Sequence, residues 1–271
     1  MVFKRVSHSV VQILEEFYLK CSWLEPTPYS RQAIYQEAKA FQKLRTCSPF
    51  AIPWNMEIKL GPYICILTKN VGKSLGSLLA SDKGEEYIPY LDRFLQQLER
   101  WITDTSYTVD IQDITINPWL KTKEKIISLL EEGENHHSIN HIKQTLRVPQ
   151  QVKVFKEHGD LNLENVMINK KRNISLIDPR FGVYPIVFPY IKMLYMWVLL
   201  HSNADCSLTV IQKILESAAR IGLSEEIKEL LPTTLLRIIY PQMMEAKFHN
   251  LINDTKKSEV IYTLDFIWNQ L

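Results

Sequence analysis

The sequence predicts an α+β fold in two parts, a small β-rich N-terminal part and a larger helical C-terminal part. Two observations lead to this prediction. Short runs of β-branched and aromatic residues dominate before residue 70, whereas apolar residues recur at helical spacing over most of the later chain. A polar stretch with a glycine, residues 69–73, lies where the pattern changes. We therefore expect an N-terminal part at residues 1–70 and a C-terminal part at residues 71–271.

The N-terminal part is expected to contain one or two strands, one helix and a hairpin, in that order. The first strands fall within Val10–Lys20, and two prolines interrupt the chain after them. Within Ser30–Leu44 apolar residues recur at the spacing of a helix. Ile52–Leu60 and Tyr63–Leu67 are apolar runs separated by Gly61-Pro62, and this pattern predicts two strands joined by a tight turn.

Helices dominate the C-terminal part. Between residues 88 and 102 apolar side chains follow a 3-4-3-4 spacing, which predicts an amphipathic helix. Similar stripes occur at Trp119–Leu130, Leu208–Ile221, Leu235–Phe248 and Val260–Trp268. Short apolar runs interrupt these helices: we expect strands at Val152–Phe155, Val166–Ile168 and Ile174–Ile177, the last two joined by a turn at Lys170–Asn173.

Composition is that of an ordinary globular protein and argues against two classes of partner. Of the 271 residues, 46% are hydrophobic and 23% are charged, and the net charge is +2. Because the charges are scattered and form no basic face, we expect no nucleic-acid partner. The longest apolar run, Tyr184–Leu200, contains two prolines and a lysine, so it is too short and too broken to cross a membrane. The oligomeric state is left open.

The cysteines and the N-terminus predict a cytoplasmic protein. Cys21, Cys47, Cys65 and Cys206 lie far apart and form no CxxC pair. Sparse cysteines in a chain of this size favour reduced thiols over a disulfide framework. The first residues contain no long apolar stretch followed by small residues, as a secretory signal would.

Residues 157–182 carry the pattern that is most specific for chemistry. Asp160 opens a loop after Gly159, Asn165 follows five residues later at the start of a strand, and Asp178 ends the return strand. If these strands pair, Asn165 and Asp178 lie at the same end of the hairpin. An amide oxygen and a carboxylate there suit Mg²⁺, while a second carboxylate suits a substrate hydroxyl, as phosphoryl transfer requires. A structural hairpin with Asx turns would not explain these joint spacings.

This segment resembles the aminoglycoside phosphotransferase and choline kinase family, whose signature is HGD-x₄-N followed by a strand that ends in a metal-binding Asp. The resemblance implies a protein kinase-like bilobal fold, with Asp160 as the catalytic base and Asn165 and Asp178 as Mg²⁺ ligands. It also implies that His158 braces the catalytic loop. Arg180 suits a contact with substrate or phosphate and equally suits a structural pair with a carboxylate.

The resemblance extends to the N-terminal part with lower specificity. Lys20 would bind the α- and β-phosphates and pair with Glu37 of the helix. Without the resemblance, Lys20 equally suits the solvated end of a strand, and Glu37 equally suits the surface of a helix. Thr68 and Asn70 lie in a segment that resembles the interlobe hinge, where backbone groups receive the nucleotide base.

The loop that would cover the phosphates departs from the family pattern. No glycine precedes Gly61, so this loop cannot be glycine-rich, and Ser7 and Ser9 are its candidate residues. Gly72-Lys73-Ser74 resembles the end of a P-loop but lacks the earlier glycine that this motif requires, so a P-loop is rejected.

The resemblance implies an ATP- or GTP-dependent enzyme that moves the γ-phosphate to a hydroxyl of a small molecule. The acceptor would be a sugar, an aminoglycoside-like compound or an amino alcohol. The main alternative is a pseudokinase or nucleotide-binding scaffold, which the absent glycine-rich loop favours. A protein kinase is disfavoured because Gly159 occupies the position where those enzymes have Arg.

Overall fold

The computed structural model describes residues 2–6, 9–13, 16–22, 28–110 and 150–231, together with residues 234, 235, 238 and 267. The chain divides into two compact units. The first contains residues 1–77 and 157–182, and the second contains residues 78–156 and 183–271. The first unit is therefore built from two separate stretches of chain. The boundary expected between residues 70 and 71 stays a prediction.

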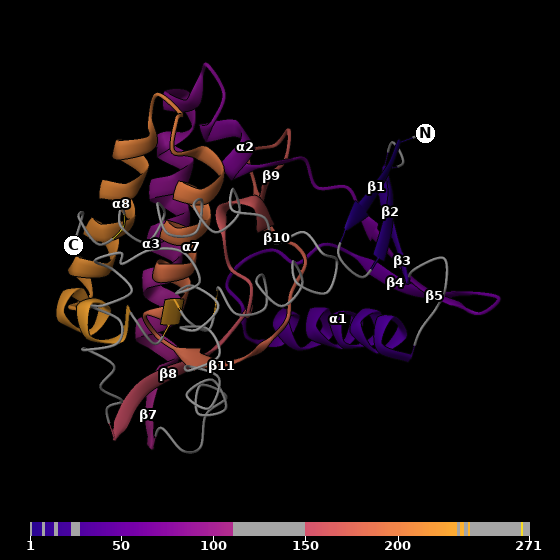
Figure 1. Ribbon diagram of the computed structural model, residues 1–271, viewed down its shortest axis with the longest axis horizontal. Helices are drawn as coiled ribbons and strands as arrows, with labels where there is room; N and C mark the ends of the chain where they lie inside the picture. Colours follow the sequence, from indigo (N-terminus) through magenta and orange to yellow (C-terminus); the bar gives the residue numbers. More distant parts are fainter. Residues whose placement is uncertain are drawn as a thin grey trace, which may run out of the picture. The chain divides into compact units, whose positions relative to one another are not determined.

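A five-stranded antiparallel sheet forms the first part of the first unit (Figure 1). The spatial order is β1-β2-β3-β5-β4. The strands are β1 (Val2–Val6), β2 (Ser9–Ile13), β3 (Phe17–Ser22), β4 (Asn55–Leu60) and β5 (Tyr63–Lys69). The one or two strands expected within residues 10–20 are present as β2 and β3, and the later hairpin is present as β4 and β5. Strand β1 was not predicted.

Helix α1 (Pro28–Cys47) lies along this sheet, and it confirms the helix expected over residues 30–44. Its residues Ile34 and Ala38 pack with Ile66 of β5 in one buried cluster. All three side chains are at most 8% exposed, so the apolar stripe of the helix is what fixes it on the sheet.

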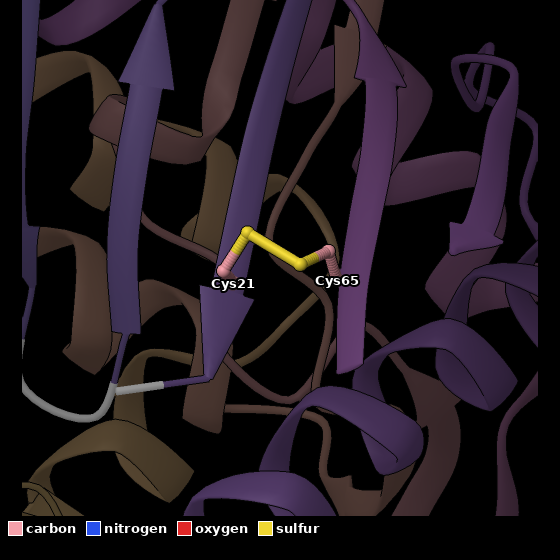
Figure 2. Close-up of a disulfide and its surroundings, with 2 residues drawn as sticks. All are labelled: Cys21 and Cys65. Carbon is pink, nitrogen blue, oxygen red and sulfur yellow. A yellow bond between two sulfur atoms is a disulfide. The ribbon is translucent and has the colours of Figure 1, made fainter. Parts of the chain in front are cut away.

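A disulfide joins two neighbouring strands of the sheet (Figure 2). The register of β3 and β5 places Cys21 directly opposite Cys65, with 4.0 Å between their Cα atoms. The expectation that all four cysteines are reduced thiols is therefore wrong for this pair. Their separation of 44 residues in the sequence concealed their pairing in the sheet. Cys47 and Cys206 are not bonded to another cysteine, and the cytoplasmic location stays a prediction.

A three-stranded sheet completes the first unit, in the order β10-β9-β6. Strands β9 (Val166–Ile168) and β10 (Ile174–Leu176) form the predicted hairpin. Its turn includes Arg172, with φ 64°. Strand β6 (Lys73–Ser74) pairs with β9, so the stretch 69–73 begins and ends in strands.

The second unit is mainly helical. Helices α3 (Ile88–Thr105) and α8 (Ser207–Arg220) confirm two of the predicted stripes, and α7 (Phe188–His201) packs against α8. α2 (Leu75–Leu79) and the 3₁₀ helix η1 (Gly84–Tyr87) precede α3. A small sheet in the order β11-β8-β7 contains β7 (Tyr107–Asp110), β8 (Gln151–Glu157) and β11 (Gly182–Pro185).

Buried aromatic side chains form the core of this unit. Tyr190, Tyr195 and Trp197 of α7 are each at most 1% exposed, because this helix is apolar on almost every side. The helices expected at 119–130, 235–248 and 260–268 lie almost wholly outside the described residues. Where the chain is described, none of its helices is long and apolar enough to cross a membrane.

Candidate active site

The β9–β10 hairpin places Asn165 and Asp178 at the same end. Asn165 closes the 3₁₀ helix η3 (Leu163–Asn165) and directly precedes β9. The main-chain N–H of Ile177 donates to the carbonyl oxygen of Asn165 at 3.0 Å. Asp178 is therefore the first residue beyond that contact, as the hairpin geometry required.

The backbone of Asp178 adopts an uncommon conformation. Its φ is 58°, in the left-handed region that residues other than glycine rarely occupy, although Asp tolerates it better than most. A backbone of this kind persists only where surrounding contacts hold it.

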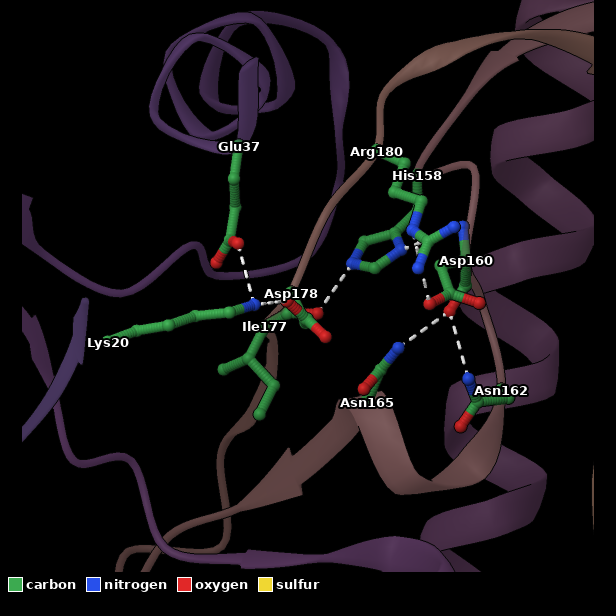
Figure 3. Close-up of polar contacts among 9 residues, drawn as sticks. All are labelled: Lys20, Glu37, His158, Asp160, Asn162, Asn165, Ile177, Asp178 and Arg180. Atoms are coloured by element: carbon green, nitrogen blue, oxygen red, sulfur yellow. Dashed lines mark hydrogen bonds and ion pairs between the residues drawn. The ribbon is translucent and has the colours of Figure 1, made fainter. Parts of the chain in front are cut away.

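The loop that carries Asp160 is held by its own main-chain carbonyl (Figure 3). This carbonyl accepts hydrogen bonds from Nδ2 of Asn162 at 3.1 Å and from Nδ2 of Asn165 at 2.8 Å. Gly159, with φ 80°, provides the tight turn before Asp160. Because Asn165 uses its amide nitrogen in this bond, its Oδ1 atom faces away from the loop.

His158 connects the Asp160 loop to the strand that ends at Asp178. Its ring is wholly buried, and Nε2 lies 2.8 Å from the carbonyl oxygen of Ile177. Nδ1 accepts from the main-chain N–H of Asp160 at 3.3 Å. A carbonyl only accepts and an N–H only donates, so these contacts require a neutral ring with its proton on Nε2. The His158 ring therefore links the main chain of Ile177 to that of Asp160 and holds the two segments together.

Lys20 contacts two carboxylates. Its Nζ lies 2.7 Å from Oε2 of Glu37 and also contacts Oδ1 of Asp178 (Figure 3). The strand β3 supplies Lys20, the helix α1 supplies Glu37, and the loop after β10 supplies Asp178. The structure therefore brings together the pair expected from the sequence and adds Asp178 to it.

This charge group shifts the pKa values of its members. Burial raises the pKa of Glu37 to about 7, and the Asp178 charge adds to that rise despite the opposing effect of Lys20. Burial alone would raise the pKa of Asp178, but the Lys20 ammonium holds it below its ordinary value. Burial would likewise lower the pKa of Lys20, and the two carboxylates raise it instead.

Arg180 lies next to Asp160. Its Nε is 3.8 Å from Oδ2 of Asp160, and its main-chain N–H donates to the carbonyl of His158 at 2.7 Å. The Arg180 side chain is 66% exposed, whereas that of Asp160 is 14% exposed. Of the two uses that the sequence left open, the carboxylate pair is present, and the exposed guanidinium can also meet a ligand.

No protein-family model matches the sequence, and no curated protein matches it. Solved structures do match. The gentamicin complex of APH(2″)-IIa has a TM-score of 0.57 and 15% identity, over 96% of this chain and 88% of that one. The amicoumacin kinase hAmiN, in complex with AMP-PNP, Ca²⁺ and Ami, has a TM-score of 0.52 and 12% identity, over 99% and 88%. The macrolide 2′-phosphotransferase MphH from Brachybacterium faecium has a TM-score of 0.51 and 11% identity, over 94% of this chain and 87% of that one.

The chain has the fold of these phosphotransferases. The predicted α+β, protein kinase-like fold class is thus confirmed, and so is the resemblance on which it rested. At these low identities the likeness concerns the fold, so the roles of individual residues are argued from their geometry.

The residues predicted to receive the nucleotide lie partly in β5 and its following segment and partly outside the described side chains. Thr68 is buried in β5, opposite Tyr18 of β3. The main-chain N–H of Asn70 donates to the carbonyl of Glu16 at 2.7 Å, so a nucleotide base would have to meet other groups of this segment. Ser7 lies outside the described residues, and Ser9 begins β2, where its side chain is not described.

The residues around Asp178 fit a magnesium ion by their chemistry. Asp178 offers carboxylate oxygens, and the orientation of Asn165 leaves Oδ1 as the atom that can face a cation. Within the described part of the chain, no group of three or more His, Cys, Asp or Glu side chains is placed to hold a metal. Mg²⁺ commonly takes only one or two protein carboxylates and completes its shell with phosphate and water oxygens, so this small donor set is compatible with it.

Sequence reasoning missed Asn162. This side chain is 5% exposed, and its Oδ1 accepts from the main-chain N–H of Glu164 at 2.9 Å. It therefore caps η3 and holds the Asp160 carbonyl at the same time. Asn is a preferred residue at the position before a helix, so the N-cap preference of Asn162 could have identified this residue from the sequence.

Proposed function

We propose that the protein is a small-molecule kinase that transfers the γ-phosphate of ATP or GTP to an alcohol hydroxyl. The observation that carries the proposal is the contact of Lys20 with Glu37 and Asp178 beside a braced loop that presents Asp160. A hairpin with only a structural role has no need of a half-buried lysine between two acids. The phosphotransferase fold supports the same reaction class.

In this proposal Asp160 accepts the proton of the acceptor hydroxyl or orients that oxygen for attack. His158 and Asn162 hold the loop, so the carboxylate is positioned before the substrate arrives. Preorganisation of this kind is the main protein contribution to phosphoryl transfer, because the transition state needs little covalent assistance.

Asn165 and Asp178 would hold Mg²⁺, which when bound neutralises charge on the nucleotide phosphates. Lys20 would contact the other phosphates, and Glu37 would keep its ammonium in place. Phosphate oxygens can take over the ammonium from Asp178, since both are anionic acceptors for the same donors.

The acceptor is proposed as a small hydroxyl compound: a sugar, an aminoglycoside-like compound or an amino alcohol. Neighbouring structures are named for antibiotics, among them gentamicin and the macrolides. Arg180 beside Asp160 adds positive charge at the point where the hydroxyl would arrive. Among these candidates a neutral sugar is therefore favoured at this position over the cationic aminoglycoside-like compounds and amino alcohols. A cytoplasmic location belongs to the same proposal.

The test is an acceptor screen with ATP and Mg²⁺, read by the mass increase of a phosphorylated product. Asp160→Asn and Asp178→Asn are run in parallel, together with Asp82→Asn as a control on the exposed surface. We expect a product with the parent protein and the control but not with the two site variants. If all four proteins bind nucleotide and none forms product or hydrolyses ATP, the nucleotide-binding scaffold replaces the kinase.

A further inference from the structure

Glu164 joins the Asp160 loop to the segment 72–77. Its Oε2 atom accepts from the hydroxyl of Ser74 at 2.6 Å and lies 3.1 Å from that of Ser77. The two hydroxyls are also 2.6 Å apart, and the main-chain N–H of Ser77 donates to Oγ of Ser74 at 3.1 Å. One carboxylate therefore gathers two serines that lie 90 and 87 residues away in the sequence.

The backbones of these segments also approach each other closely. Ser74 pairs with Met167 across β6 and β9. Gly72 has φ 112°, and a Cβ atom there would overlap the carbonyl of Ile168. A Cβ atom at Gly76 would overlap the carboxylate of Glu164. Gly72 is thus required for the close approach of the two backbones, and Gly76 leaves room for the Glu164 carboxylate, so the contact involves the backbone as well as the side chains.

Glu164 lies within the turn that carries Asn165. Its main-chain N–H donates to Oδ1 of Asn162, and the N–H of Asn165 donates to the Asn162 carbonyl at 3.0 Å. Any shift of Glu164 moves this short turn. An O–H···O⁻ hydrogen bond of 2.6 Å is charge-assisted and stronger than a neutral one, so the carboxylate is well suited to resist such a shift.

We propose that Glu164 is a positioning residue that fixes the Asn165 amide by anchoring its turn to Ser74 and Ser77. The inference rests on the proposed function, because it assigns Asn165 to the cation. Glu164 itself touches neither nucleotide nor cation in this proposal. Its effect reaches the cation through the orientation of Asn165.

The test uses Glu164→Gln, Glu164→Ala and Ser74→Ala, with Glu57→Gln as a matched change of an exposed acid in β4. Two readouts are independent of turnover. Hydrogen exchange reports on the amides of residues 162–168. Electron paramagnetic resonance of Mn²⁺ at a saturating non-hydrolysable ATP analogue reports on the affinity for the cation.

We expect faster exchange at residues 162–168 and roughly tenfold weaker Mn²⁺ binding for Glu164→Ala, in the range known for residues that orient metal ligands. Glu164→Gln should lie between this variant and the parent, and Glu57→Gln should match the parent. Nucleotide affinity measured in EDTA should stay the same in all variants.

Two results would overturn the inference in distinguishable ways. If the parent binds Mn²⁺ with the nucleotide and Glu164→Ala binds it equally well, Glu164 does not position Asn165 and the proposed function stands. If the parent shows no Mn²⁺ affinity with nucleotide, the assignment of Asn165 to a cation fails and the positioning role fails with it.

Discussion

Lys20 and Asp178, 158 residues apart in the sequence, form an ion pair within the first compact unit. The same ammonium serves Glu37, so one cation stands between two acids. Without Lys20, two neighbouring carboxylates would share a half-buried site and repel each other.

Replacing this cation should therefore lower stability. We expect Lys20→Met to reduce the free energy of unfolding by about 2 kcal/mol at pH 8, below the 3–5 kcal/mol typical of a fully buried pair because Asp178 is 38% exposed. Urea denaturation measures the change. Lys213→Met removes a partly exposed pair with Asp92 and should cost less than about 1 kcal/mol. Equal losses in the two variants would contradict the charge argument.

Glu37 makes stability depend on pH. Its pKa in the folded protein is about 7, against an ordinary value of 4.5, so folding favours the protonated form. The stabilisation that protonated Glu37 gives the folded protein is therefore complete below pH 4.5 and is lost as the pH rises through 7. The free energy of unfolding of Glu37→Gln, relative to that of the parent, should therefore rise by up to about 3 kcal/mol between pH 4.5 and 8. Urea midpoints at several pH values measure this gain, and a constant difference between the two proteins would show that Glu37 keeps an ordinary pKa.

Asp160 is expected to govern turnover and not nucleotide binding. Asp160→Asn should lower kcat by about 10²–10⁴-fold, the usual contribution of a general base. The nucleotide Kd should change less than about twofold, because Asp160 is proposed to meet the acceptor and not the nucleotide. Steady-state rates and calorimetry provide the two values. Unchanged kcat with a weakened Kd would assign Asp160 to the nucleotide.

The disulfide can be counted and its contribution measured. Under denaturing, non-reducing conditions the protein should show two reactive thiols, and after reduction it should show four. Closing a loop of this length stabilises a fold by about 2–4 kcal/mol, so a reductant should lower the Tm of the parent. The double variant Cys21→Ser/Cys65→Ser lacks the bond, so its Tm should resemble that of the reduced parent whether or not a reductant is present. Four thiols before reduction would exclude the bond.

Local patterns in the sequence predicted much of the fold. The helical spacing at 30–44 and 88–102 is decided by neighbours three and four residues away, and both helices are present. The spacing of Asp160, Asn165 and Asp178 likewise belongs to one loop and one hairpin.

Features that depend on distant pairing could not be found in this way. Cys21 meets Cys65 only because β3 and β5 adopt one particular register. Glu164 meets Ser74 only because β6 joins β9, and two residues are too few to show a strand pattern. The strands β7 and β11 have only four residues each, and both lie beside β8, which belongs to a separate segment of the chain.

The divided first unit has a consequence for how the protein is made. Residues 1–77 leave the ribosome well before residues 157–182, which complete the same unit. Until then β6 has no partner strand and Lys20 has no Asp178 to meet. Joining the two stretches closes a loop of about 80 residues, at an entropic cost of about 4 kcal/mol. A prematurely terminated chain would therefore contain Lys20 without the acid that pairs with it, so translation must pass residue 178 before the proposed site can form.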